Sequence, residues 1–205
     1  MKKLLSVLIA LTIAPCAMAQ VAKTNTKEST SFYLGVGVGV SDLGATRAAG
    51  ITYTQDDNRD THSKIFLGYQ LNSLFALETS YHDLGKYKAA GSISGTAISA
   101  NNEGTAWVVA AKLTPMSEQL VSPFIKLGAA RLTAEETGDF GGTPFSAKKT
   151  KTNAYYAVGV DYEISKALTA SVAYESFGKA GDDNDDNQPA RIKPTAISVS
   201  ITTRF

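Results

Sequence analysis

Apolar residues recur at every second position in eight separate segments of this 205-residue chain. In the first segment, Phe32, Leu34 and Val36 alternate with Tyr33 and with glycines. A period of two is typical of a β-strand with one apolar face, because successive side chains of a strand point to opposite faces. The alternation therefore predicts an all-β protein, with strands over residues 31–40, 64–71, 75–82, 106–113, 124–129, 155–162, 170–175 and 196–205.

The connections between these strands alternate between long and short. The stretches 41–62, 85–104, 132–153 and 178–194 are long and polar, whereas those at 72–73, 114–122 and 165–166 are shorter. Long loops at one end and short turns at the other are typical of a chain that runs up and down through neighbouring antiparallel strands. We therefore predict an eight-stranded antiparallel up-and-down β-barrel over residues 31–205.

Alternation alone leaves open which face of the barrel is apolar. The positions between the apolar ones form the second parity of each strand. They are rich in small residues such as Gly37, Ala110 and Ser171, which suit the narrow lumen of an eight-stranded barrel. The apolar parity carries aromatic residues at both strand ends, as do the girdles of outer-membrane barrels. We therefore predict a transmembrane barrel with apolar side chains outward, long loops outside the cell and short periplasmic turns; a soluble ligand-binding barrel is the alternative. The predicted girdles are Phe32, Tyr69, Phe75, Tyr162 and Phe205 near the short turns, and Tyr81, Trp107, Tyr156 and Tyr174 near the long loops.

Residues 1–19 have the features of a secretory signal peptide. Lys2 and Lys3 precede an apolar run, and the small residues Ala17 and Ala19 predict cleavage after Ala19. Residues 20–30 would then form a polar periplasmic leader. Cleavage would also remove Cys16, the single cysteine, so we expect no disulfide. The balance of 20 basic against 19 acidic residues argues against nucleic-acid binding. We expect no cofactor and no bound metal.

Two neighbouring segments carry a resemblance to a known family. Residues 67–72 (LGYQLN) and 75–85 (FALETSYHDLG) resemble the second and third strands of the OmpA-like transmembrane domain, a small eight-stranded outer-membrane barrel. The resemblance implies a place in the outer membrane and insertion by the barrel-assembly machinery. The chain stops after the barrel, so the family's peptidoglycan-binding domain is not expected. The terminal assembly signal would comprise Val199, Ile201 and Phe205, although Thr203 departs from the family pattern.

Charged residues also stand on the inward parity. In the OmpA-like family such charges pair inside the lumen, and Glu78, Lys112, Lys126 and Asp161 match those positions; Arg204 shares their parity. Buried charges of both signs are tolerated when they pair. We therefore predict a permanent polar plug that closes the lumen. The alternative is a gate in a narrow, porin-like ion channel.

Glu78, Ser80 and His82 share one strand face and suggest a catalytic triad. Same-face neighbours on a strand are about 6.5–7 Å apart, which exceeds the roughly 3 Å contact that a nucleophile needs with its base. His62, the other histidine, lies at a loop margin. We therefore expect no enzyme activity, and a lipid A-modifying enzyme is the alternative.

The loops offer weaker signals. Ser146 and Lys149 match an S-x-x-K pattern outside a helix, and the acidic stretch 182–186 lacks the calcium-loop pattern. Basic residues such as Arg47, Lys148 and Lys151 suit anionic headgroups. The expected role is structural, in envelope integrity and in adhesion through the extracellular loops. The expected partners are outer-membrane lipids, lipopolysaccharide and a host or surface ligand held by the loops.

Overall fold

A computed structural model describes residues 30–44, 52–57, 59–93, 95–115, 119–179 and 192–205. The predicted signal peptide, its cleavage site at Ala19, nearly all of the leader, Arg47 and the acidic stretch 182–186 lie outside these residues. In the described part of the chain, no helix is long and apolar enough to cross a membrane.

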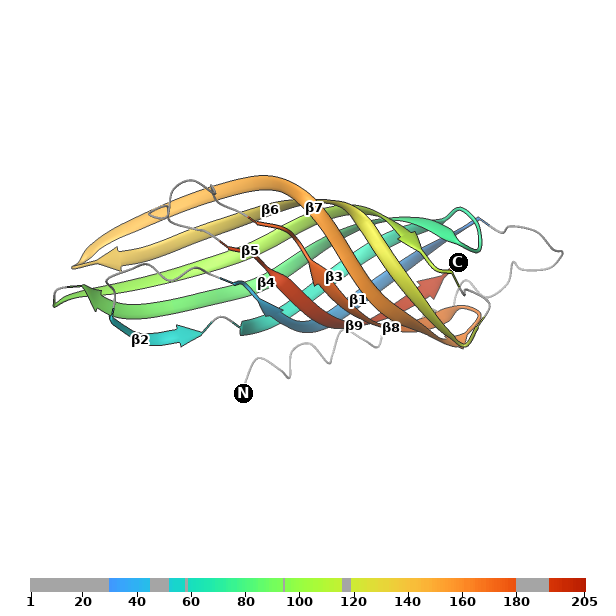
Figure 1. The fold of residues 1–205 in the computed structure, drawn as a ribbon, viewed down its shortest axis with the longest axis horizontal. Helices are drawn as coiled ribbons and strands as arrows, with labels where there is room; N and C mark the ends of the chain where they lie inside the picture. Colours follow the sequence, from blue (N-terminus) through green and yellow to red (C-terminus); the bar gives the residue numbers. More distant parts are fainter. Residues whose placement is uncertain (1–29, 45–51, 58, 94, 116–118, 180–191) are drawn as a thin grey trace.

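The described ranges contain eight barrel strands and one additional short strand (Figure 1). Each barrel strand pairs antiparallel with its two neighbours, in the order β4, β3, β1, β9, β8, β7, β6, β5, and pairing of β4 with β5 closes the ring. The predicted eight-stranded up-and-down barrel is therefore confirmed. The barrel strands are β1 (Ser31–Asp42), β3 (Arg59–Gln70), β4 (Phe75–Ile93), β5 (Thr96–Leu113), β6 (Val121–Phe140), β7 (Thr143–Ser165), β8 (Leu168–Ser176) and β9 (Thr195–Arg204); the additional strand, β2 (Thr52–Asp57), pairs with the far end of β4.

Two predicted long loops are mostly strand. Strands β4 and β5 stay paired as far as Ile93 and Thr96, and β6 and β7 as far as Phe140 and Thr143. These two hairpins extend beyond the rest of the barrel (Figure 1). Polar residues on both faces hide the period of two there, yet cross-strand pairing still satisfies the backbone N–H and C=O groups. Gly85, with a φ of 74°, lies where the register of β4 against β5 shifts, so the strand passes through a bulge and continues.

Exposed ion pairs lie on the extended hairpins. Lys86 pairs with Glu103 across β4 and β5, and Lys148 pairs with Glu135 across β6 and β7. The hydrogen bond from the Lys86 ammonium to the Glu103 carboxylate raises the pKa of Lys86. Side chains of this kind need water, so the hairpins project out of the apolar part of the barrel.

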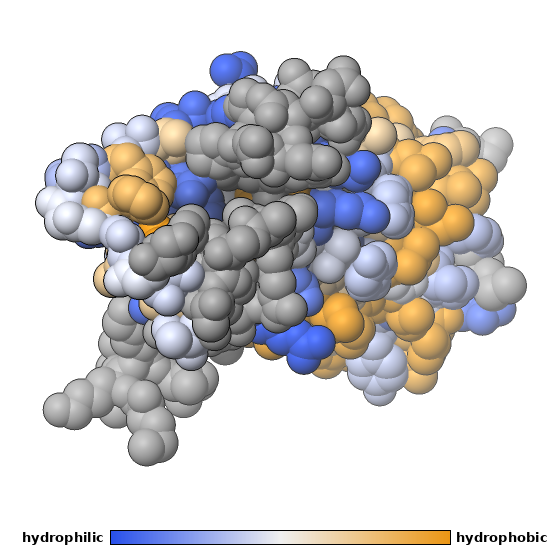
Figure 2. All heavy atoms as spheres, turned by 60° about the vertical axis from the view of Figure 1, so that its left-hand side comes forward, coloured by the Kyte–Doolittle hydropathy of each residue, from blue (hydrophilic) through white to orange (hydrophobic). Residues whose placement is uncertain are grey.

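The two faces of the barrel wall differ as predicted. On β5 the side chain of Val109 is 64% exposed while that of Val108 is 2% exposed, and on β3 the values are 43% for Leu67 and 5% for Phe66. Figure 2 shows apolar residues gathered on the barrel wall and hydrophilic residues toward the hairpin end. The apolar parity thus points away from the lumen, which is the orientation that a lipid environment requires.

Glycines make room for the aromatic rings of the lumen. Gly68 lies directly opposite Tyr33, and Gly35 directly opposite Phe66, across β1 and β3. A Cβ atom at Gly68 would lie 2.0 Å from Cζ of Tyr33, and one at Gly35 would lie 2.1 Å from Cζ of Phe66. Each ring therefore occupies the space that a side chain would otherwise fill, and these glycines fix where the rings lie.

An apolar cluster fills the lumen at its hairpin end. Leu43, Leu84, Leu132 and Phe177 are 0% exposed and Ile192 is 1% exposed. They pack with inward alanines of β5, β6 and β7 in one continuous core. The interior at this end is therefore packed like that of a soluble β-protein.

Candidate functional site

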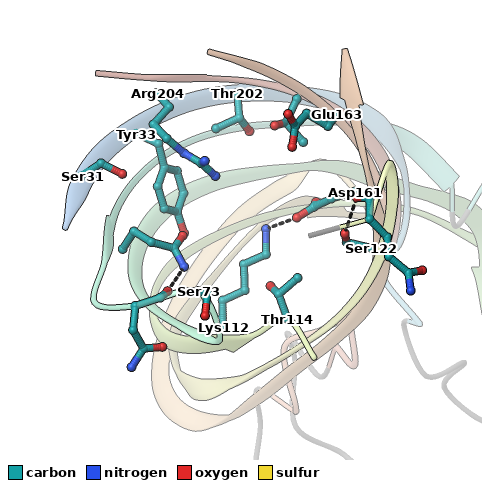
Figure 3. A pocket seen from close by; sticks show the side chains of 14 residues that line it. Ser31, Tyr33, Ser73, Lys112, Thr114, Ser122, Asp161, Glu163, Thr202 and Arg204 are labelled. Atoms are coloured by element: carbon teal, nitrogen blue, oxygen red, sulfur yellow. Dashed lines mark hydrogen bonds and ion pairs between the residues drawn. The ribbon is translucent and has the colours of Figure 1, made fainter. Parts of the chain in front are cut away.

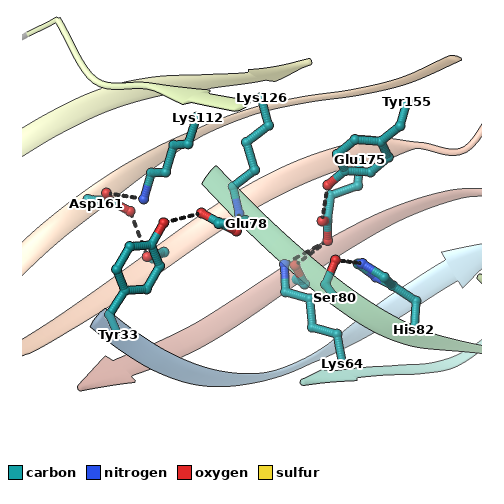
Figure 4. Close-up of polar contacts among 12 residues, drawn as sticks. Tyr33, Lys64, Glu78, Ser80, His82, Lys112, Lys126, Tyr155, Asp161 and Glu175 are labelled. Atoms are coloured by element: carbon teal, nitrogen blue, oxygen red, sulfur yellow. Dashed lines mark hydrogen bonds and ion pairs between the residues drawn. The ribbon is translucent and has the colours of Figure 1, made fainter. Parts of the chain in front are cut away.

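A chain of polar side chains crosses the lumen between the short turns and the apolar cluster. Figure 4 shows carboxylates, ammonium groups and hydroxyls converging there from opposite walls of the barrel. The first group centres on Glu78 of β4. Its Oε2 accepts from Nζ of Lys126 at 2.5 Å, and its Oε1 accepts from the Tyr33 hydroxyl at 2.9 Å. Glu78 and Lys126 are buried, so each charge depends on its partner.

Aromatic rings flank the Lys126 ammonium. Its Nζ atom lies 5.1 Å from the ring centroid of Phe66 and 5.3 Å from that of Phe124. A cation above a ring face is attracted by the ring quadrupole. The two rings therefore stabilise the charge while they exclude water from it.

A second group lies nearer the short turns. Nζ of Lys112 donates to Oδ2 of Asp161 at 2.6 Å, and the Ser171 hydroxyl donates to Oδ1 of Asp161 at 2.7 Å. These two charged side chains are 14% and 15% exposed, because they line a pocket at that end of the barrel.

The pocket has a volume of about 310 Å³ and a polar lining (Figure 3). Tyr33, Lys112, Asp161, Glu163 and Arg204 contribute to its wall. The polar group of Glu78 and Lys126 lies deeper, so the pocket leads into the barrel only as far as the first buried ion pairs.

A third group spans the lumen from β3 to β8. Nζ of Lys64 donates to Oε2 of Glu175 at 2.8 Å, and the Ser198 hydroxyl donates to the same oxygen at 3.0 Å. The Tyr155 hydroxyl donates to Oε1 of Glu175 at 2.7 Å. Both charged side chains are almost completely buried, so Glu175 is held from three directions.

Four of the five charged residues predicted for the lumen form two separate pairs. Lys126 meets Glu78, Lys112 meets Asp161, and Arg204 lines the pocket. Lys64 and Glu175 stand on the same inward parity and are buried, but the predicted set of five did not include them. The hydroxyls of Tyr33 and Tyr155 were missed, since both tyrosines stand on the inward parity where small residues dominate.

The contacts of the two histidines differ from what their sequence positions predicted. Oγ of Ser80 and Nε2 of His82 are 2.8 Å apart, so the spacing argument against contact between these two side chains was wrong. Side chains two positions apart can lean together even when their Cα atoms cannot. Glu78, the third residue of the suggested triad, pairs with Lys126 and so does not complete a triad with Ser80 and His82. His62, expected at a loop margin, is a buried residue of β3.

The residues predicted for the aromatic girdles stand on the outward parity of the barrel wall. Near the short turns the rings of Phe32 and Tyr69 have centroids 4.8 Å apart, and near the hairpins those of Tyr81 and Trp107 are 5.0 Å apart. Outward exposure is 42–61% at Phe75, Tyr162, Phe205, Trp107 and Tyr156, and 40% at Tyr174.

The residues predicted as an assembly signal lie on and beside β9. Val199 and Ile201 pair with Val38 and Val36 of β1, so they line the seam where the last strand meets the first. The backbone N–H of Phe205 donates to the carbonyl of Phe32 at 3.0 Å.

Comparison with known proteins gives consistent results at the level of sequence. A family model described as an outer membrane protein beta-barrel domain matches residues 6–205. Outer membrane protein A of Serratia marcescens is 30% identical over 206 residues, which cover 96% of this chain and 55% of that protein. The chain thus spans about half the length of this curated relative.

Solved structures share the fold. Neisserial surface protein A superposes with a TM-score of 0.51 at 15% identity, over 85% of this chain and 97% of that one. Ail of Yersinia pestis, in complex with the heparin analogue sucrose octasulfate, gives 0.51 at 14% identity, over 88% and 100%. OprG of Pseudomonas aeruginosa gives 0.51 at 13% identity, over 87% and 97%.

Proposed function

Since this chain belongs to the outer membrane protein beta-barrel domain family, we propose that it is a non-enzymatic structural protein of the outer membrane that makes surface contacts through its extracellular hairpins. Its location is the cell outer membrane. The observation that carries the proposal is the filled lumen. Ion pairs occupy the half toward the short turns, and the apolar cluster around Phe177 occupies the half toward the hairpins.

A filled lumen favours a closed barrel rather than an open channel. An ion that enters from the pocket meets the pair of Lys126 and Glu78, then the buried pair of Lys64 and Glu175, and beyond them the packed apolar cluster around Leu132 and Phe177. Recording from the purified protein in planar lipid bilayers tests this. We expect no stable conductance, and steady nanosiemens openings would favour the narrow channel.

The proposal of a non-enzymatic role rests on the surroundings of Ser80 and His82. Both are buried in the lumen, and the pocket near the short turns is lined by other residues. A lipid substrate would have to reach them through the apolar cluster or the ion pairs. Replacement of His82 by Gln is expected to leave the lipid A composition of the host membrane unchanged by mass spectrometry. A change in lipid A with His82→Gln, but none with Lys148→Met, would favour the lipid-modifying enzyme.

Surface contact is assigned to the hairpins because they project beyond the apolar wall. Ail of Yersinia pestis was solved with a heparin analogue, and the β6–β7 hairpin of this chain carries Lys148, Lys149 and Lys151. We propose contacts with lipopolysaccharide and with an external ligand at this end, outer-membrane lipids around the wall, and the barrel-assembly machinery as a partner during insertion.

A shortened hairpin separates the surface role from the structural one. Glu135 pairs with Lys148 across the hairpin, so residues 136–147 can be replaced by an Asn-Gly turn that keeps the register. The variant also carries Lys148→Gln, Lys149→Gln and Lys151→Gln, because the shortened hairpin alone would keep these three lysines. We expect cells with this variant to keep normal detergent resistance while their attachment to a heparin-coated surface falls to that of cells lacking the protein. Attachment equal to wild type would contradict a role for this hairpin.

A further inference from the structure

The two histidines of the chain meet inside the lumen. Nε2 of His62 on β3 lies 3.1 Å from Nδ1 of His82 on β4, and both side chains are almost completely buried. Ligand atoms of His62, His82 and Glu175 all lie within 4.8 Å of one another. Two imidazoles and a carboxylate in one buried cluster are a donor set that divalent transition metals prefer.

We propose that His62, His82 and Glu175 bind a divalent transition-metal ion of the zinc type inside the barrel. The sequence alone predicts no bound metal, and the three residues come together only in the folded barrel. Two nitrogens bound to one tetrahedral ion at 2.0–2.1 Å are about 3.3 Å apart, close to the 3.1 Å between the facing histidine nitrogens. Small movements of the side chains therefore suffice to place both nitrogens on one ion.

The His62 ring has fewer hydrogen-bond partners than the His82 ring. His82 uses both ring nitrogens, one toward His62 and one toward Ser80 at 2.8 Å. Nδ1 of His62 is buried and has no hydrogen-bond partner among the described residues. Among the described residues His62 is thus hydrogen-bonded only through Nε2, and an ion held between Nε2 of His62 and Nδ1 of His82 would replace the single hydrogen bond that joins the two rings.

The surroundings match those of metal-bound histidines. When His82 holds a metal through Nδ1, its Nε2–H can donate to the Ser80 hydroxyl, which fixes the tautomer and the ring orientation. The Phe177 ring lies 4.9 Å from the His82 ring and 6.4 Å from the His62 ring, centroid to centroid, and shields them from water. The bound ion would join β3 and β4 to β8 across the lumen.

Lys64 is the competitor of the ion. Its ammonium occupies Oε2 of Glu175, and Tyr155 occupies Oε1. An ion at the histidines would share the negative charge of Glu175 with Lys64, which lowers its affinity. Replacement of Lys64 by Met removes the competing cation and leaves the carboxylate to the metal. The site therefore predicts tighter metal binding in Lys64→Met, an effect that nonspecific surface binding would not show.

The test uses the full chain refolded in detergent micelles, with folding verified by the gel shift between unheated and boiled samples. Co²⁺ is the probe, since tetrahedral coordination gives it visible absorption bands. We expect saturation of these bands at one equivalent of Co²⁺, bleaching by Zn²⁺ and no bleaching by Mg²⁺. The bands should disappear in His62→Gln and His82→Gln, weaken in the double variant Lys64→Met/Glu175→Gln, and saturate at lower Co²⁺ in Lys64→Met.

The double variant Lys112→Met/Asp161→Asn is the matched control, because it removes another ion pair of the lumen and leaves the three ligands in place; its bands should equal those of wild type. Zn²⁺ should also raise the temperature at which the wild-type barrel loses its folded mobility, and should leave that of the histidine variants unchanged. Absence of cobalt bands in the folded wild type, or bands that persist in both folded histidine variants, would overturn the proposal.

Discussion

The buried pair of Lys126 and Glu78 allows a quantitative test of how the lumen is held together. Replacement of Lys126 by Met leaves the Glu78 carboxylate buried without its counter-ion, and such changes destabilise proteins by about 3–5 kcal/mol. The Tyr33 hydroxyl still donates to Glu78, so we expect a loss near the lower limit, about 3 kcal/mol. That loss lowers the folding equilibrium constant by more than about a hundredfold.

Removal of both charges should reverse most of this loss. In Glu78→Gln/Lys126→Met, the amide oxygen of the new side chain at position 78 still accepts from Tyr33, and no unpaired charge remains. Replacing a whole buried pair by neutral groups is often neutral or stabilising by about 1–4 kcal/mol. The double variant should therefore be more stable than Lys126→Met and close to wild type, with strong coupling between the two positions.

Urea unfolding of the barrel in lipid vesicles measures both variants. Trp107 is the single tryptophan and is 60% exposed on the outward face, so its emission changes when the barrel leaves the lipid. Lys148→Met is the control, since it breaks an exposed pair with Glu135 that contributes at most about 1 kcal/mol. If Lys126→Met loses no more stability than Lys148→Met, the pair does not hold the lumen together and the reasoning is refuted.

Three further substitutions test other parts of the barrel by the same unfolding assay. Gly68→Val places side-chain atoms inside the Tyr33 ring and should cost at least about 1–3 kcal/mol; wild-type stability would show that the ring lies elsewhere. Leu77→Arg puts a charge on the outward wall between Phe75 and Tyr81 and should cost about 2–4 kcal/mol, against about 0–1 for Ser63→Arg beyond Tyr81; equal costs would contradict the lipid-facing wall. Phe177→Ala removes the ring that packs on His82 and should cost about 3–5 kcal/mol, and a smaller loss would show that the apolar cluster collapses around the gap.

The sequence alone was sufficient to predict which residues form the outer wall of the barrel. Side chains alternate strictly along a strand, so parity puts Leu67 and Val109 on the same face without knowledge of any partner. The small residues of the other parity and the aromatic strand ends then identify that face as the lipid face. The same rule placed Glu78, Lys112 and Lys126 inward. The alternation did not predict that the hairpins are strands, because polar residues occupy both faces beyond the membrane. Only the cross-strand pairing in the folded protein shows that they are strands.

Contacts inside the lumen depend on the tertiary structure alone. Lys64 and Glu175 are 111 residues apart, and they meet because the ring places β3 and β8 across the same narrow lumen. His62 and His82 meet because the register of β3 against β4 brings Lys64 opposite His82, one same-face step from His62. Parity along one strand therefore determined which side chains enter the barrel, while closure and register, which depend on all eight strands together, decided which of them touch.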